Sequence, residues 1–220
     1  ALDNMKKVVS IEQPPNQASL ANAARLALLL DQYQEAENFI RQALDLDQEN
    51  PDLITNLVRL LALKEDWESA RSFANRLIES DKSKALGYFI QASIDSSLED
   101  FDSAILSLKS SLDVEPRGVE SLSSIASMIS DKKSIEEAVE YISTHCDTYD
   151  KQPHCFHILG SLYARNGEFK DAIDATEKAI TLSPKLTISY RQLAKIYGYM
   201  QDLDAVASSL NRGYEATNDF

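Results

Sequence analysis

The chain has 220 residues, 44% of them hydrophobic and 26% charged, a composition that indicates a folded protein and excludes a disordered one. Acidic residues outnumber basic ones by 35 to 22, and with a net charge of -13 and no long basic run the sequence argues against a nucleic-acid partner. No apolar run could span a bilayer, so we expect no membrane insertion; the composition suits a cytoplasmic location or, after removal of a leader, a periplasmic one.

Residues of matching size recur every 34 positions between Gln17 and Phe220, a stretch that contains six such blocks. Position 17 of each block is large and apolar: Tyr33, Trp67, Phe101, Ile135, Phe169 and Leu203. Positions 8 and 20 are small: Ala24, Val58, Ala92, Ala126, Gly160 and Ala194 in the first case, and Ala36, Ala70, Ala104, Ala138, Ala172 and Val206 in the second. A period of this length indicates an array of similar units, each packed on its neighbours.

Each block predicts two helices joined by a short polar turn. The apolar positions within a block fall three or four residues apart, which is helical spacing. Pro51 and Pro153 open their blocks, where the first turn of a helix tolerates proline, and Pro116 and Pro184 fall where a second helix should stop. The predicted units are residues 17–50, 51–84, 85–118, 119–152, 153–186 and 187–220.

The two ends of the chain differ from the blocks between them. Pro14 occupies the place of the last proline of a preceding unit, so residues 1–16 read as the second helix of a truncated unit; the alternative is a solvated leader. No capping helix is visible after Asn218. We therefore expect either that the chain is a fragment of a longer array or that its last helix caps itself with the polar residues Asp202, Asp204, Asn211 and Arg212.

These columns resemble the tetratricopeptide repeat. Unit 153–186 matches the family pattern best, with Phe156, Leu159, Gly160, Tyr163, Ala172, Ala179 and Pro184 at the family's positions. The resemblance implies an all-α fold, a right-handed α-solenoid of helix-turn-helix hairpins with six 34-residue repeats and an N-terminal half-repeat. It does not name a partner, because proteins of this family serve many unrelated assemblies.

In that family the first helix of each repeat lines a concave groove. The residues that the family geometry selects here as a partner-binding groove are Asn22, Arg25, Asn56, Arg59, Leu86, Phe89, Ile90, His157, Arg191 and Lys195. The pair of Asn22 and Arg25 recurs one repeat later as Asn56 and Arg59, a ladder that could bind an extended backbone or acidic side chains. The alternative is that these arginines are ordinary surface residues. Of the groove residues that bind chaperone tails in one subclass of the family, only Asn56 is matched here, so we do not expect that ligand.

The third block departs from the pattern. Gln91 and Asp95 occupy positions that are apolar in the other blocks, whereas Phe89 and Ile90 are apolar where the groove should be. One interpretation is an apolar pocket in the groove, with Phe89 as an anchor for a partner side chain. The other is that this helix is rolled and buries a different stripe, which runs from Ile90 to Leu98.

All three histidines and both cysteines fall between residues 145 and 157: His145, Cys146, His154, Cys155 and His157. Zinc takes such ligands, but His145 and Cys146 occupy core positions of the repeat, so we expect no metal and no cofactor. The favoured interpretation is that the cysteines are free and behave as small apolar core residues. A Cys146–Cys155 disulfide is the alternative, because both residues flank the same turn.

The sequence has no glycine-rich phosphate loop and no paired-histidine helix motif. We therefore expect no enzymatic activity, and predict a scaffold for protein-protein interaction that binds a peptide or helix of a partner protein in its groove. The alternative is a structural segment of a longer array that stacks on further repeats, or that self-associates through its terminal helices.

Overall fold

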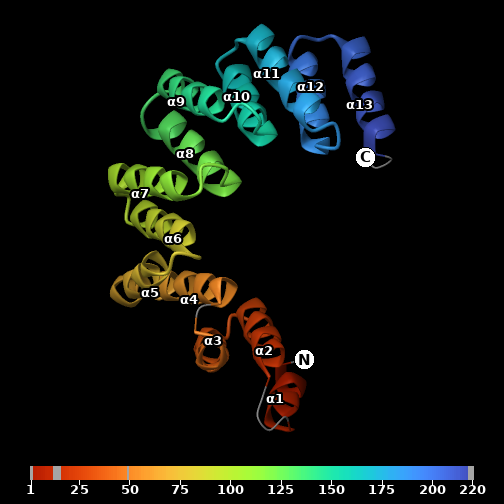
Figure 1. Ribbon diagram of the computed structural model, residues 1–220. Coiled ribbons are helices and arrows are strands. Elements are labelled where there is room, and N and C mark those ends of the chain that lie inside the picture. The colour runs from red at the N-terminus through yellow and green to blue at the C-terminus, as the bar shows by residue number, and fades with distance from the viewer. Residues whose placement is uncertain (1, 12–15, 49, 218–220) are drawn as a thin grey trace. The chain divides into compact units, whose positions relative to one another are not determined.

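A computed structural model describes residues 2–11, 16–48 and 50–217, and all regular structure within them is α-helical (Figure 1). The chain divides into two compact units, residues 1–111 and 112–220. The all-α helical-repeat solenoid predicted from the sequence is confirmed. Its right-handed superhelix and the count of six repeats stay predictions.

The first unit contains the helices up to α6 and most of α7. Their bounds are α1 (Leu2–Ile11), α2 (Gln17–Leu29), α3 (Tyr33–Leu46), α4 (Pro51–Leu63), α5 (Trp67–Glu79), α6 (Lys84–Ser97) and α7 (Phe101–Val114). Each helix from α1 to α5 packs against the next one along the chain, and the alternate helices α4 and α6 are also in contact. The unit is therefore a row of helices in which most contacts join sequence neighbours.

The second unit has the same organisation. Its helices are α8 (Val119–Lys132), α9 (Ile135–Thr148), α10 (Pro153–Arg165), α11 (Phe169–Leu182), α12 (Thr187–Tyr199) and α13 (Leu203–Thr217). Successive helices pack together, and α10 also contacts both α8 and α12. We call α2, α4, α6, α8, α10 and α12 the first helices, and α3, α5, α7, α9, α11 and α13 the second helices.

The helices begin where the repeat predicts them. Five first helices start at the first residue of a predicted block, and α6 starts at Lys84, one residue before its block. All six second helices start at position 17. Side chains just before several helices accept a hydrogen bond from the first turn; Asn16 does so from Ser19 N and Asp66 from Ser69 N. Helix starts thus follow the sequence, although the six-unit division itself stays a prediction.

The turn within a hairpin uses a left-handed backbone. Its residues with positive φ are Asp31 (55°), Glu65 (58°), Glu99 (61°), Gly167 (80°) and Gln201 (60°), all at position 15 of their blocks. This conformation ends a helix and lets later N–H groups bond to its last carbonyls, as Gln32 N does to Ala27 O at 2.9 Å. Only one of the five residues is glycine. The other four turns therefore bear the steric cost that a Cβ atom brings in the left-handed backbone region.

The small columns allow the helices to approach closely. The five alanines at position 20 are completely buried, and the residues at position 8 are also buried. A Cβ added to Gly160 would lie 2.4 Å from Thr176 Oγ1 and 2.9 Å from Gln192 Nε2. Only glycine fits there, because α11 and α12 both press against the same turn of α10.

The bulky residues at position 17 are not all packed alike. Trp67 is half-buried and packs against the core of the first unit, and Phe169 is half-buried as well. Tyr33 and Leu203 are exposed, with 38% and 75% of their surface accessible. A large apolar residue at position 17 is therefore not buried in every block.

Candidate functional site

A pocket of about 680 Å³ opens between the first helices α10 and α12 of the second unit. The residues that line it are Ser161, Ala164, Arg165, Gly167, Phe169, Gln192, Lys195, Ile196 and Tyr199. Most of them lie one or two turns apart on these two helices, which are in contact. The volume is in the range of pockets that bind a small molecule or a few side chains of a peptide.

Aromatic rings and one cation form part of this pocket. The rings of Phe169 and Tyr199 stack with their centroids 6.3 Å apart, and Tyr199 is 56% exposed. Lys195 Nζ lies 5.7 Å from the centroid of the Tyr199 ring, within the range of a cation–π contact. The pocket therefore offers an accessible aromatic surface beside an ammonium group.

Two polar side chains complete the lining. Arg165 Nη2 donates to Asp131 Oδ1 at 2.9 Å, and this hydrogen bond is the largest cause of a lowered pKa of Asp131. Gln192 Nε2 donates to the carbonyl of His157 at 3.0 Å. Within the described part of the chain, the buried Gln192 Oε1 has no protein partner. The carbonyl of His157 therefore orients this amide at the wall of the pocket.

Of the three groove residues predicted in this unit, Lys195 alone lines the pocket. Arg191 is exposed on α12, outside the pocket lining. His157 is half-buried, and its Nδ1 lies 3.3 Å from Ser189 Oγ of α12. Burial, followed by the nearby His154, lowers the pKa of His157 to about 4. The expectation that His157 presents itself to a ligand is therefore replaced by a structural role: it joins α10 to α12 as a neutral ring.

The predicted ladder of the first unit lies on α2 and α4, both of which pack against α3. Asn22, Arg25 and Arg59 are exposed, and Asn56 is half-buried. Neither guanidinium forms an ion pair with any residue that the structure describes. Unlike the arginines of the second helices α3 and α5, which pair with carboxylates, the two ladder arginines remain available to an outside anion.

The third predicted repeat matches the rolled-helix interpretation in part only, since Asp95 stays buried at its usual core position, and Ile90 is a correction to the predicted groove. Ile90 and Ile94 are 3% and 1% exposed and belong to the core of the first unit, so Ile90 cannot contact a ligand. Leu86 also packs against this core, and Phe89 is half-buried. Leu98, predicted at the end of the buried stripe, is 42% exposed.

Helix α6 carries a buried carboxylate that forms an ion pair. Asp95 is 2% exposed, and Arg71 Nη2 of α5 donates to its Oδ1 at 2.6 Å. Ser107 Oγ lies 3.4 Å from the other carboxylate oxygen. A carboxylate at a position that is apolar elsewhere is tolerated because the preceding second helix supplies its counter-charge.

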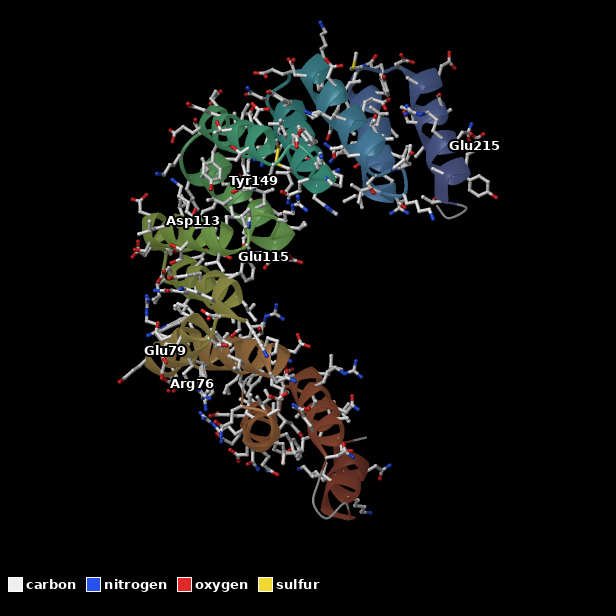
Figure 2. All side chains as sticks on the ribbon, in the orientation of Figure 1. Arg76, Glu79, Asp113, Glu115, Tyr149 and Glu215 are labelled. Atoms are coloured by element: carbon white, nitrogen blue, oxygen red, sulfur yellow. A yellow bond between two sulfur atoms is a disulfide. The ribbon has the colours of Figure 1, made fainter. Side chains whose placement is uncertain are left out.

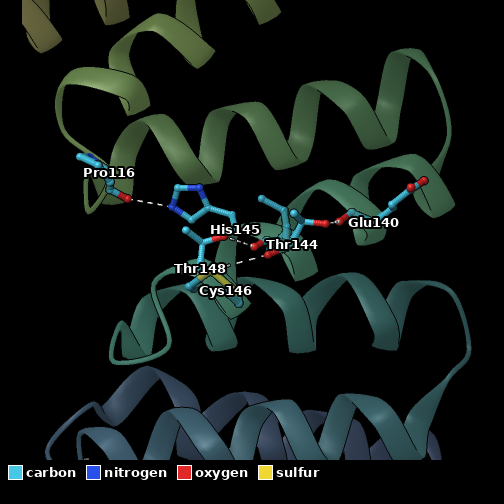
Figure 3. The surroundings of a disulfide bond; sticks show 8 residues. Pro116, Glu140, Thr144, His145, Cys146 and Thr148 are labelled. Carbon is cyan, nitrogen blue, oxygen red and sulfur yellow. Dashed lines mark hydrogen bonds between the residues drawn. A yellow bond between two sulfur atoms is a disulfide. The ribbon is translucent and has the colours of Figure 1, made fainter.

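The two cysteines form a disulfide, which corrects the favoured interpretation that they are free. Cys146 near the end of α9 and Cys155 in the first turn of α10 have Cα atoms 5.6 Å apart, and both side chains are fully buried (Figure 3). His145, the residue before Cys146, bonds through Nε2 to the carbonyl of Pro116 at 2.8 Å. The turn between α9 and α10 is therefore covalently closed.

Charge is distributed unevenly between the two kinds of helix. The six first helices together carry seven basic and four acidic residues, whereas the six second helices carry seven basic and 16 acidic residues. The acidic balance of the whole chain thus comes mainly from the second helices and the turns. The first helices present an excess of positive charge.

Two simple kinds of site have no support in the described residues. No group of three or more histidine, cysteine, aspartate or glutamate side chains there is arranged to bind a metal ion. None of the helices in the described ranges combines the length and apolar content that a bilayer-crossing helix requires.

Two models of the tetratricopeptide repeat family match the sequence, one over residues 27–87 and one over residues 153–186. No curated protein sequence matches it. Among solved structures, pilF of Pseudomonas aeruginosa is similar with a TM-score of 0.53 and 15% identity, over 88% of each chain. A tetratricopeptide repeat protein of Thermus thermophilus, TTC0263, has a TM-score of 0.53 and 17% identity, over 82% of this chain and 98% of that one.

A tetratricopeptide repeat protein of Parabacteroides merdae ATCC 43184 gives the same TM-score of 0.53 with 14% identity, over 91% of this chain and 80% of that one. Identities this low indicate a shared fold and nothing about partners.

Sequence reasoning missed most of the pocket. Arg165 and Tyr199 lie at position 13, in the last turn of a first helix. Family geometry places this position in the groove, so including it in the predicted groove would have found both residues. Phe169 was identified only as one of the large apolar residues at position 17, and Gln192 has no distinguishing signal in the sequence. Its role depends on the closeness of α10 and α12 at Gly160.

Proposed function

Because the chain belongs to the tetratricopeptide repeat family, we propose that it is a non-catalytic scaffold that binds an acidic peptide segment of a partner protein along its first helices. Scaffolding by protein-protein interaction is the general role of the family; the peptide and its site are the proposal. The observation that carries it is the charge asymmetry, since an otherwise acidic protein concentrates its positive charge on the first helices.

The chemistry of the pocket between α10 and α12 narrows the ligand. Lys195 favours a carboxylate, and the Phe169–Tyr199 stack favours an aromatic or aliphatic side chain beside it. A segment with one bulky apolar residue next to an acidic one fits both features.

The exposed arginines of the first unit fit the same class of ligand. Arg25 and Arg59 each have an amide one turn earlier, and guanidinium groups bind carboxylates through paired hydrogen bonds. We treat this ladder and the pocket as two separate binding surfaces, one in each unit.

The proposal is tested by selecting random peptides on the wild-type protein and measuring their affinities by fluorescence anisotropy. We expect the selected peptides to be enriched in acidic residues next to an aromatic or branched aliphatic residue. The variants R25E/R59E and K195E/Y199A should each weaken binding of some selected peptides by about tenfold or more, because hot-spot residues of this type contribute on the order of 2 kcal/mol.

The control matched to K195E/Y199A is Lys170→Glu, which makes the same change of charge on the exposed surface of the second helix α11. It should leave every affinity nearly unchanged. Selected peptides that are basic, or that lose affinity only with the control variant, would contradict the proposal.

A second candidate function is assembly through the end of the array. It is favoured by one observation: the last helix, α13, exposes the large apolar residues Leu203, Leu210 and Tyr214. A protein that uses this helix would be a structural segment that stacks on further helices or on a second copy.

A further inference from the structure

The last helix has an apolar stripe that no described part of the chain covers. Leu203, Leu210 and Tyr214 are 75%, 38% and 59% exposed, and with the exposed Ala207 they recur at intervals of three and four residues. Such spacing places all four on one face of α13. A neighbouring side of the helix is packed: Ser209 and Gly213 are buried.

The same face of the preceding second helices is covered by a helix. Leu210 corresponds in the repeat to Ile142 of α9 and Thr176 of α11, both of which are fully buried. Tyr214 corresponds to Cys146 and Ile180, which are 0% and 5% exposed. In each case the next first helix, α10 or α12, packs against the second helix. The exposed stripe of α13 is therefore the continuation of an interface that the structure builds twice within this unit.

The charges beside the stripe indicate what kind of helix fits it. Asp204 and Glu215 are exposed and lie on the same flank of α13, three turns apart, and Asp202 is exposed just before the helix. Figure 2 shows Glu215 on the side of α13 that faces away from α12. The basic residue of the helix, Arg212, is already engaged with Glu177 of α11 through two hydrogen bonds. An approaching surface therefore meets acidic groups at the edge of the stripe.

A second copy fits this surface poorly. Pairing two α13 helices in antiparallel fashion around the middle of the stripe brings Glu215 of one chain near Asp202 of the other, and each chain carries a net charge of -13. A helix with basic residues beside its apolar face avoids this repulsion and adds attraction.

We propose that the exposed face of α13 binds an amphipathic α-helix of another polypeptide, with small and branched apolar residues on one face and lysine or arginine beside them. This inference makes the assembly candidate specific, and it concerns a surface separate from the pocket and the arginine ladder. The bound helix takes the place that α12 takes on α11.

The probe is a synthetic peptide with the sequence of α12, residues 187–199, acetylated, amidated and fluorescently labelled. It contains Arg191 and Lys195 and no acidic residue, and as part of the protein it covers the matching face of α11. Anisotropy titrations with the full chain should show saturable binding. The variant L203S/L210S/Y214S should weaken it by about tenfold or more, because these are the large apolar residues of the stripe.

Two controls make the result specific. The variant Leu63→Ser changes a leucine on α4 that is 65% exposed. This variant should bind the peptide as tightly as the wild-type protein does. The peptide with Arg191→Glu and Lys195→Glu should bind about tenfold more weakly or worse, because it would then meet the acidic flank with like charges.

Several outcomes would overturn the proposal. These are failure of the wild-type chain to bind the peptide, equal binding by the triple-serine variant, and equal binding of the charge-reversed peptide. Sedimentation equilibrium provides an independent check: a dimer that the triple-serine variant abolishes would assign the face to a second copy instead. Loss of acidic-peptide binding in the groove variants leaves this result unaffected, so the two proposals fail separately.

Discussion

At the scale of single residues, buried charges are tolerated only where the preceding or following repeat neutralises them. Glu37 of α3 is 8% exposed and accepts hydrogen bonds from Lys64 of α4 and Arg41 of its own helix. The bond from Lys64 is the largest cause of its lowered pKa. Asp95 depends in the same way on Arg71. These pairs stabilise adjacent hairpins against each other, since loss of one partner would leave a buried charge uncompensated.

His157 predicts a pH dependence of stability. Its pKa is about 4 in the folded protein, mainly through burial, against an ordinary value of 6.5. Because the folded-state pKa is the lower one, protonation favours the unfolded chain: the stabilisation is complete above pH 6.5 and is lost as the pH falls towards 4. Allowing for partial exposure, we expect a loss on the order of 1–2 kcal/mol over this range.

The measurement is the free energy of urea unfolding at several pH values for the wild type and for His157→Gln. The variant retains polar atoms near Ser189 but does not titrate, so its stability should fall less between pH 6.5 and pH 4. His154→Gln is the matched control, because it leaves the main cause, burial, in place and should preserve most of the dependence. Identical pH profiles for His157→Gln and the wild type would refute the assignment.

At the scale of helices, a second helix is complete only when the next first helix covers it. Ile180 on α11, which packs with Tyr190 and Leu193 of α12, is 5% exposed, whereas Tyr214 at the same position of α13 is 59% exposed. The same logic explains the close contact at Gly160, where α10, α11 and α12 converge. Each hairpin therefore gains much of its burial from its neighbour rather than from itself.

The disulfide between α9 and α10 adds a covalent constraint to one such junction. Cys146 and Cys155 are 9 residues apart in sequence, and closing a loop of this size in the unfolded chain accounts for about 2–3 kcal/mol of stability. The variant C146A/C155A should lose approximately this amount in urea unfolding. A reductant should destabilise the wild type, once the buried sulfurs become accessible, and leave the variant unchanged.

Thiol titration of the unfolded protein gives a direct check. Without reductant the wild type should show no reactive thiol, and with reductant it should show two. Two reactive thiols without reductant would mean that the cysteines are free in the protein.

The first unit has no disulfide at its helix junctions. Arg76 and Glu79, which Figure 2 shows on α5, lie near one of these junctions.

At the scale of the whole molecule, local stability should differ between helices packed on one side and helices packed on two. α13 contacts α12 and has an exposed outer face, whereas α11 is packed between α10 and α12. We expect amide hydrogens of α13 to exchange roughly 10 to 100 times faster than those of α11, because opening an end helix breaks fewer contacts.

Hydrogen exchange followed by mass spectrometry resolves this gradient. The amides of α9 and α10, which the disulfide joins, should be among the slowest in the second unit. Saturation with the α12-sequence peptide should slow exchange in α13 more than elsewhere. Equal protection of α13 and α11 in the free protein would contradict the expected gradient.

Much of the fold could be predicted from the order of residues. The 34-residue period located the starts of the second helices and the buried alanine column, because a repeated helix contact demands small residues at the same place each time. The candidate site was less predictable. Lys195 and the exposed arginines followed from family geometry, but the pocket around Lys195 also needs Phe169 and Gln192, whose positions depend on how tightly three helices pack.

Periodic burial is a local property of a chain, since spacing alone decides which residues share a face of a helix, and this is why hairpins, turns and their starts are legible in the printed sequence. The burial of Asp95 on α6, the contact of His157 with Ser189 and the choice between free and bonded cysteines are not decided there. Each depends on a group that another helix supplies: Arg71 for Asp95, Ser189 for His157, and Cys155 for Cys146. A side chain's protonation, pairing or exposure follows from the helix packed against it, and packing is settled only when the chain is folded.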